Sequence, residues 1–292
     1  MSDRHFRADD DSGGDEEGPA PVSRRQLLGA TAGAAAGATG LSAASRSASA
    51  SELTGCDDWL EAPAEYPEID LTDAEPTASN LEEIGEEFVV FVHGWHGLET
   101  STDQANTLRE ALEQNGFDRP VIAASWEADT RNYWRAENTT ETAGGRLAAW
   151  LENEADDATV HLVGHSLGGR ACLETLAALE SRVETASLLG TAADDDAVCT
   201  AGAYGCGIER AADTVYNYHS ENDASVCYGY DLQSLSSGLG CAGSDCGGGW
   251  FRSGSSLPQN YVDVDVTDEV GDHCAYAKPD VGCADLIADA LE

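Results

Sequence analysis

One short segment, VGHSLGGR at residues 163–170, constrains the fold more than any other part of the chain. Residues 164–168 fit the pattern G-x-S-x-G, with an apolar, strand-like run before them and a helical pattern after them. In that context the serine lies on a strained strand-to-helix turn, where side chains at Gly164 and Gly168 would collide with nearby backbone. The segment therefore predicts that Ser166 is a nucleophile; the alternative is a serine in an ordinary tight turn.

Strands and helices are predicted to alternate from Glu87 onward. Apolar or alternating runs predict strands at 88–92, 121–126, 158–163, 183–189, 213–219 and 261–267. Helical spacing predicts helices at 101–115, 137–153, 167–181 and 283–291. This order predicts an α/β protein whose mostly parallel sheet is flanked by helices in one domain. The loops after 189 and between 224 and 258 are rich in Gly, Ser and Cys, which is typical of lids and binding loops.

The chain is strongly acidic. Its 292 residues include 54 Asp and Glu against 15 Lys and Arg, for a net charge of −39, and Lys278 is the only lysine. No cluster of cations is present to contact phosphates, so nucleic-acid binding is disfavoured. The acidic residues are spread along the chain and interleaved with apolar runs, a composition that resembles proteins of extreme halophiles.

The first 50 residues resemble a twin-arginine signal peptide. Ser23-Arg24-Arg25-Gln26-Leu27-Leu28 is followed by a weakly hydrophobic Ala/Gly stretch and by Ala48-Ser49-Ala50, an A-x-A cleavage site. The alternative is a chance arginine pair before a membrane anchor, for which the Ala/Gly stretch is poorly suited. Residues 51–85 predict an acidic arm with one short strand. We expect a secreted protein that uses the twin-arginine translocase as its partner during export.

Cysteine usage fits an exported chain. The nine cysteines should mostly pair, and an odd number leaves at least one unpaired. Cys172, at an apolar position of the helix after Ser166, is the predicted buried free thiol. Leu53-Thr54-Gly55-Cys56 resembles a lipobox, so a lipid anchor on Cys56 at the cell surface is the lesser alternative. A zinc site is disfavoured, since the spacings are not C-x-x-C and no paired His lies nearby.

The chain resembles the α/β-hydrolase family, especially its lipase and esterase branch. The residues that carry the resemblance are 164–169 and Phe91-Val92-His93-Gly94-Trp95, and it extends over about 87–292. It implies a single α/β-hydrolase domain at 86–292, with Cys/Gly-rich lid loops. It also implies that the backbone N–H groups of Trp95 and Leu167 form an oxyanion hole, and that no metal or organic cofactor takes part.

The family order Ser, Asp/Glu, His leaves few candidates for the base and the acid. Only His219 and His273 follow Ser166, and His273 lies beyond the last predicted strand, where the family places its base. His219 is expected to make a structural hydrogen bond beneath the site. Asp223, just past the fifth of these strands, is the predicted acid. Its rivals are the group Asp194, Asp195 and Asp196 and, less favoured, Glu221.

These residues predict acyl transfer from a small-molecule or lipid ester, through an acyl-enzyme on Ser166 that water then hydrolyses. A second hypothesis keeps the same triad but applies it to amide, thioester or acyltransfer chemistry. A third is a non-catalytic surface-binding protein on a hydrolase scaffold, because fold alone does not decide activity.

The net charge predicts that stability depends on salt. At an ionic strength of about 1 M the Debye length falls to about 3 Å, which screens the repulsion among the carboxylates. We expect the melting temperature to rise by about 10 °C between about 0.1 M and about 2 M KCl or NaCl, as followed by circular dichroism. A melting temperature that does not rise with either salt would contradict this prediction.

Overall fold

The computed structural model describes residues 56–81, 85–155, 157–230, 237–247 and 254–292. The predicted signal peptide lies outside these residues, as does part of the Gly/Cys-rich segment before Pro258. These described residues form one compact unit. Among the described residues, none of the helices combines the length and the apolar character needed to cross a bilayer.

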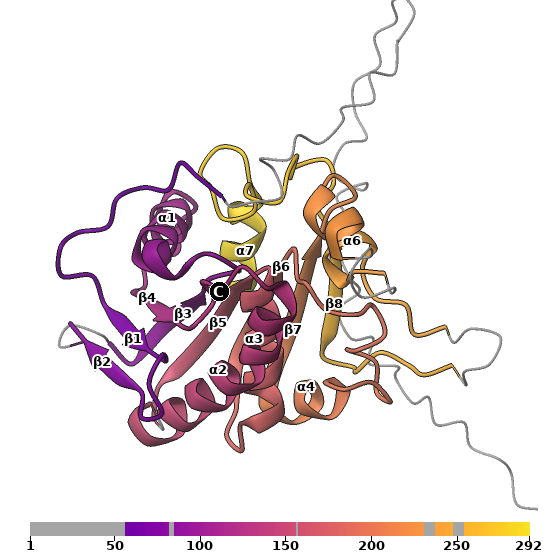
Figure 1. Ribbon diagram of the computed structural model, residues 1–292, viewed down its shortest axis with the longest axis horizontal. Helices are drawn as coiled ribbons and strands as arrows, with labels where there is room; N and C mark the ends of the chain where they lie inside the picture. Colours follow the sequence, from indigo (N-terminus) through magenta and orange to yellow (C-terminus); the bar gives the residue numbers. More distant parts are fainter. Residues whose placement is uncertain (1–55, 82–84, 156, 231–236, 248–253) are drawn as a thin grey trace, which may run out of the picture. The chain divides into compact units, whose positions relative to one another are not determined.

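The apolar runs form the strands of a single sheet (Figure 1). The strands are β1 (Glu68–Asp70), β2 (Thr77–Ser79), β3 (Glu87–Val92), β4 (Val121–Ser125), β5 (Thr159–His165), β6 (Val183–Leu189), β7 (Ala212–His219) and β8 (Tyr261–Asp265). They lie in the order β2-β1-β4-β3-β5-β6-β7-β8, and every neighbouring pair is parallel except β1 with β2. This mostly parallel sheet, flanked by helices, is the α/β-hydrolase fold.

Helices cover both faces of the sheet (Figure 1). They are α1 (Ser101–Gln114), α2 (Tyr133–Glu154), α3 (Leu167–Ala178), α4 (Gly205–Ala211), α6 (Leu239–Ala242) and α7 (Ala284–Leu291), with a short 3₁₀ turn η2 (Leu98–Thr100) and a π-helical turn η3 (Ser225–Tyr230). One apolar core lies between the sheet and α2, α3 and α4, and the other between the sheet and α1 and α7. Alternate residues of β3 enter the two cores, which explains its uninterrupted apolar sequence.

The acidic arm contributes more structure than its sequence predicts. Two short strands, β1 and β2, replace the single expected one, and β1 pairs with β4 in the main sheet. Helix α2 begins at Tyr133, a turn earlier than predicted, because the Asn132 side chain accepts a hydrogen bond from the Arg135 N–H and caps it. The alternating strand β8 lies at the sheet edge, as its half-exposed pattern predicts.

Two glycines on neighbouring helices make a matched test of the packing. A Cβ added at Gly168 in α3 would lie 2.0 Å from the Val92 carbonyl oxygen, whereas one added at Gly145 in α2 meets nothing within 4 Å. We expect Gly168→Ala to destabilise the protein by about 3 kcal/mol through overpacking. Gly145→Ala should be neutral or stabilising by up to about 1 kcal/mol. Urea denaturation at one fixed high salt concentration measures both, and equal stabilities of the two variants would contradict the prediction.

Candidate active site

Ser166 stands at the sharp turn between β5 and α3. Its backbone has φ 59° and ψ −121°, a conformation that costs a non-glycine residue about 1–3 kcal/mol. The turn is held on both sides: the Ser166 N–H donates to the Leu189 carbonyl at 2.9 Å, and the Ser166 carbonyl accepts from Gly169 at 3.1 Å and Ala192 at 3.2 Å. This strained strand-to-helix turn is the one that the G-x-S-x-G motif predicts.

The two glycines of the motif are needed for space. A Cβ at Gly164 would lie 2.5 Å from the Gly168 carbonyl oxygen, and one at Gly168 would lie closer still to the end of β3. Such distances are far below van der Waals contact, so no larger residue fits without moving the backbone. The missing side chains allow α3 to begin directly against β3 and β5.

The loop after β3, which carries Gly94 and Trp95, lies against Ser166, since a Cβ at Gly94 would be 2.9 Å from the Ser166 Cβ. The Gly94 carbonyl accepts hydrogen bonds from the His93 ring at 2.9 Å and from the Gly97 N–H at 3.2 Å. In a planar trans peptide the next N–H points opposite to that carbonyl, so these bonds also fix the direction of the Trp95 N–H. Leu167 opens α3, where first-turn N–H groups have no acceptor within the helix.

Asp223 and His273 are brought together from loops 50 residues apart in the chain. His273 Nδ1 lies 2.7 Å from Asp223 Oδ2, and the Asp223 side chain is fully buried. The same carboxylate accepts hydrogen bonds from the Tyr276 hydroxyl at 3.1 Å and from the Val226 N–H at 3.0 Å. Three donors thus fix the carboxylate beside the imidazole.

The environment of His273 suits a base. Burial alone would lower its pKa, but the charge of Asp223 and the hydrogen bond to it outweigh burial and raise the pKa above the usual 6.5. Because Nδ1 donates to Asp223, Nε2 carries the free lone pair of the neutral ring. Within the described residues no hydrogen bond joins His273 to the Ser166 hydroxyl. Such contacts often tighten only when substrate is bound.

The rival residues are engaged elsewhere. Asp194 accepts a hydrogen bond from the Tyr230 hydroxyl at 2.9 Å, and Asp195 and Asp196 follow it, half-buried, in the loop after β6. Glu221 is exposed. His219 ends β7 and is buried, yet its Nδ1 has no hydrogen-bond partner among the described residues, so the structural hydrogen bond expected there is not formed at that nitrogen.

Two other histidines, His165 and His93, make hydrogen bonds at the site and are neutral near pH 7. His165 Nε2 donates to the His273 carbonyl at 2.7 Å, which positions the backbone of that loop. Burial, aided by repulsion from His273, lowers the pKa of His165 to about 3. The second, His93, accepts from the Trp126 N–H at 3.2 Å, and burial lowers its pKa to about 4. The sequence indicates that both pack and hydrogen-bond, but not which carbonyls they hold.

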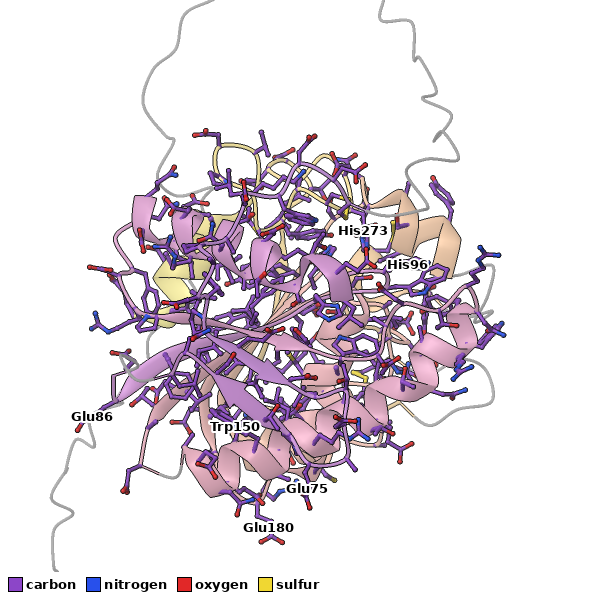
Figure 2. The ribbon with its side chains drawn as sticks, turned by 60° about the vertical axis from the view of Figure 1, so that its left-hand side comes forward. Glu75, Glu86, His96, Trp150, Glu180 and His273 are labelled. Atoms are coloured by element: carbon purple, nitrogen blue, oxygen red, sulfur yellow. A yellow bond between two sulfur atoms is a disulfide. The ribbon has the colours of Figure 1, made fainter. Side chains whose placement is uncertain are left out.

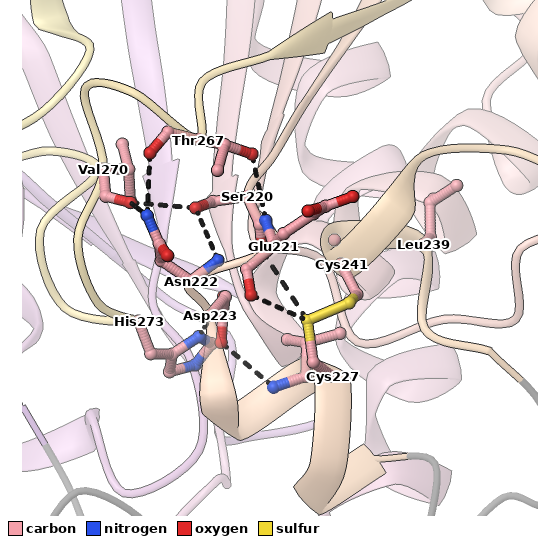
Figure 3. The surroundings of a disulfide bond; sticks show 12 residues. Ser220, Glu221, Asn222, Asp223, Cys227, Leu239, Cys241, Thr267, Val270 and His273 are labelled. Atoms are coloured by element: carbon pink, nitrogen blue, oxygen red, sulfur yellow. Dashed lines mark hydrogen bonds and ion pairs between the residues drawn. A yellow bond between two sulfur atoms is a disulfide. The ribbon is translucent and has the colours of Figure 1, made fainter. Parts of the chain in front are cut away.

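Two disulfides lie next to Asp223 and His273. Cys227, four residues after Asp223, pairs with Cys241, and Figure 3 shows the Asp223 and His273 side chains to one side of this bond. Cys56 pairs with Cys274, the residue after His273. The third disulfide joins Cys199 to Cys246. The unpaired thiols are those of Cys172, buried as predicted, Cys206 and Cys283.

Comparisons with known proteins find similarity over part of the chain. The family described as "Putative serine esterase (DUF676)" matches residues 83–192, which include Trp95, Ser166 and Leu167 but neither Asp223 nor His273. Among curated proteins, none matches this sequence. In the described residues no group of three or more His, Cys, Asp or Glu side chains is arranged to hold a metal ion.

Several solved structures are similar at low identity. A lipase-esterase related protein from Clostridium acetobutylicum is 13% identical, with 71% of this chain and 93% of that chain covered and a TM-score of 0.39. An α/β serine hydrolase without a lid from Xanthomonas campestris is 13% identical, with 80% and 94% covered and a TM-score of 0.43. An esterase from Pyrobaculum calidifontis is 13% identical, with 70% and 75% covered and a TM-score of 0.40.

The contacts of the three histidines predict distinct titrations. We expect the His273 ring to stay protonated to a pH above 6.5, because its pKa is raised, while His93 and His165 stay neutral down to about pH 4 and about pH 3. In Asp223→Asn the charge of Asp223 is lost, burial remains, and only the smaller effect of Asp272 opposes burial, so the pKa of His273 should fall below its wild-type value. Imidazole NMR titration of both proteins measures this. An unchanged His273 pKa in the variant would show that Asp223 is not its partner in solution.

Proposed function

We propose that this protein is a secreted serine hydrolase that cleaves carboxylic esters, with Ser166 as nucleophile, His273 as base and Asp223 as the orienting acid. The observation that carries the proposal is the 2.7 Å contact between His273 and a fully buried Asp223, made on loops at the same sheet edge as the strained Ser166 turn. A buried carboxylate that accepts three hydrogen bonds, one of them from an imidazole, is the arrangement that prepares a histidine to accept a proton.

The mechanism follows from these positions. His273 Nε2 takes the proton of the Ser166 hydroxyl as Oγ attacks the ester carbonyl. The negative charge that develops on the carbonyl oxygen is stabilised by the N–H groups of Trp95 and Leu167, each worth about 3 kcal/mol in such sites. The imidazolium then protonates the leaving alcohol, and a water activated by the same ring releases the acid from Ser166.

Export through the twin-arginine translocase fits the same proposal. Three disulfides form in oxidising surroundings, outside the cytoplasm. This route exports chains that are already folded. Because the cytoplasm is reducing, cross-links such as Cys56–Cys274 would close only after export. A sulfur atom in that disulfide cannot also carry a lipid, so the bond argues against an anchor on Cys56. We therefore favour a freely secreted protein.

Chemical labelling separates this function from a non-catalytic scaffold. We expect a fluorophosphonate probe to label the wild-type protein in high salt and to leave folded Ser166→Ala unlabelled. We also expect Ser166→Ala and His273→Ala to lower kcat for p-nitrophenyl esters by about 10⁴-fold or more, because each removes a member of the proton-transfer pair. A folded wild-type protein that takes up no probe would overturn the proposal.

Matched variants of the two candidate acids complete this test. Asp223→Asn should lower kcat by about 10³- to 10⁴-fold, whereas Asp194→Asn, which removes a charge but keeps an oxygen that can accept from Tyr230, should change it by less than about threefold. The reverse order would assign the acid to Asp194. Comparing ester, thioester and anilide substrates of one acyl group then distinguishes an esterase from the amidase or thioesterase alternative.

A further inference from the structure

Aromatic side chains gather at the proposed oxyanion loop. The rings of Trp95 and His96 stack with centroids 4.5 Å apart, and Tyr133 meets the Trp95 ring edge-on at 5.5 Å. Trp134 lies next to Tyr133 at 6.0 Å. The loop after β3 and the first turn of α2 therefore share one aromatic cluster, composed of Trp95, His96, Tyr133 and Trp134.

The cluster is held in place from behind. The Trp95 indole N–H donates to the Thr130 carbonyl at 2.7 Å, which fixes the plane of the ring. Tyr133 also meets Tyr230 edge-on at 6.4 Å, and the Tyr230 hydroxyl is bonded to Asp194. Trp95 and Tyr133 are restrained by these contacts. They lose little conformational entropy when a ligand binds, so this part of the surface is preorganised.

The front of the cluster faces solvent. Trp134 is 47% exposed and His96 is exposed, while Trp95 and Tyr133 are half-buried. The exposed large hydrophobic side chains of the described residues include only one other aromatic, Tyr228, on the η3 turn that follows Asp223. On a chain with net charge −39, exposed rings beside the proposed site mark an apolar contact surface.

The cluster is continuous with the reacting centre. The backbone N–H proposed to bind the oxyanion and the first ring of the cluster belong to the same residue, Trp95. Figure 2 shows the labelled His96 and His273 at the same end of the sheet, away from Glu75 and Glu180. A substrate whose carbonyl oxygen accepts from the Trp95 N–H therefore lies beside the residue whose ring begins the cluster. Tyr133 connects that ring to Trp134.

We propose that this aromatic cluster binds a planar aromatic ring of the substrate, so that the preferred substrates are esters with an aromatic ring close to the ester group. The inference rests on the proposed ester hydrolysis and adds its substrate class. Trp134, the most exposed ring, contributes through offset or edge-to-face contacts, which exceed simple area burial by an amount equivalent to about a 2- to 10-fold change in affinity. The ring can belong to the acyl part or to the alcohol part.

Two pairs of esters that differ only in ring planarity test this specificity. They are ethyl 3-phenylpropanoate against ethyl 3-cyclohexylpropanoate, and 2-phenylethyl acetate against 2-cyclohexylethyl acetate, with acid release followed by pH-stat in high salt. We expect kcat/KM to favour the aromatic member of at least one pair by about 5- to 10-fold, mainly through KM. The pair that shows the preference identifies the acyl or the alcohol side.

Variants of Trp134 connect this preference to the cluster. Trp134→Ala should reduce the aromatic-to-cyclohexyl ratio to about 1–2, and Trp134→Phe should keep at least about half of it, because a ring remains. Leu257→Ala, which removes an exposed apolar side chain of another loop, should leave the ratio unchanged. A wild-type ratio near 1 in both pairs, or a ratio unaffected by Trp134→Ala, overturns the aromatic subsite.

Fluorophosphonate labelling and turnover of the four esters together separate the serine hydrolase proposal from the aromatic substrate class. If fluorophosphonate labels Ser166 but none of the four esters is hydrolysed, the aromatic substrate class is wrong and the serine hydrolase remains. If the folded protein is not labelled at all, the hydrolase proposal itself is overturned, and the substrate class is overturned with it.

Discussion

The close approach of α3 to the end of β3 is the contact on which the site depends. Gly168 lies so near the Val92 carbonyl that only a hydrogen atom fits at the position where any other residue carries its Cβ. This approach lets the Ser166 turn and the loop carrying Gly94 and Trp95 share one corner of the sheet, so both proposed oxyanion donors belong to closely packed backbone. The strain at Ser166 is sustained because Leu189, Gly169 and Ala192 bond its peptide groups from three sides. Packing, rather than the serine itself, fixes the position of the hydroxyl.

Asp223 and His273, the proposed acid and base, are positioned in a different way, because they lie on loops with little regular structure. A loop of that kind needs other restraints to hold a side chain to within a fraction of an ångström. Here the restraints are covalent and polar: a disulfide at Cys227 beside the Asp223 turn, another at Cys274 directly after His273, and the bond from His165 to the His273 carbonyl. The N-terminal end of the described chain, at Cys56, is thereby tied to the loop of the proposed base, 218 residues away.

Local sequence was enough to predict the elements that local forces determine. The apolar runs of β3 to β7 and the turn at Ser166 follow from burial on both faces and from a motif whose flanks are correct. The choice of His273 as the base came from the order of residues in the family that the chain resembles and from elimination, and it stays a prediction; the structure places its ring 2.7 Å from Asp223. The disulfide pairing, the addition of β1 to the sheet and the meeting of Trp95 with Tyr133 could not be predicted, because each depends on which distant segments become neighbours. Cysteine spacing alone leaves the connectivity open, and the pairs formed here span 14 to 218 residues.

Salt acts differently on the surface and on the site of so acidic a protein. Exposed carboxylates repel one another across water, and molar salt with a Debye length of about 3 Å removes most of that repulsion. The Asp223–His273 pair is joined at 2.7 Å with a fully buried carboxylate, so mobile ions cannot come between the two groups. The neighbouring rings of His93 and His165 are neutral and offer nothing for salt to screen. We therefore expect high ionic strength to stabilise the fold while leaving the Asp223–His273 contact unchanged, because the exposed carboxylates are in water and the Asp223 carboxylate is fully buried.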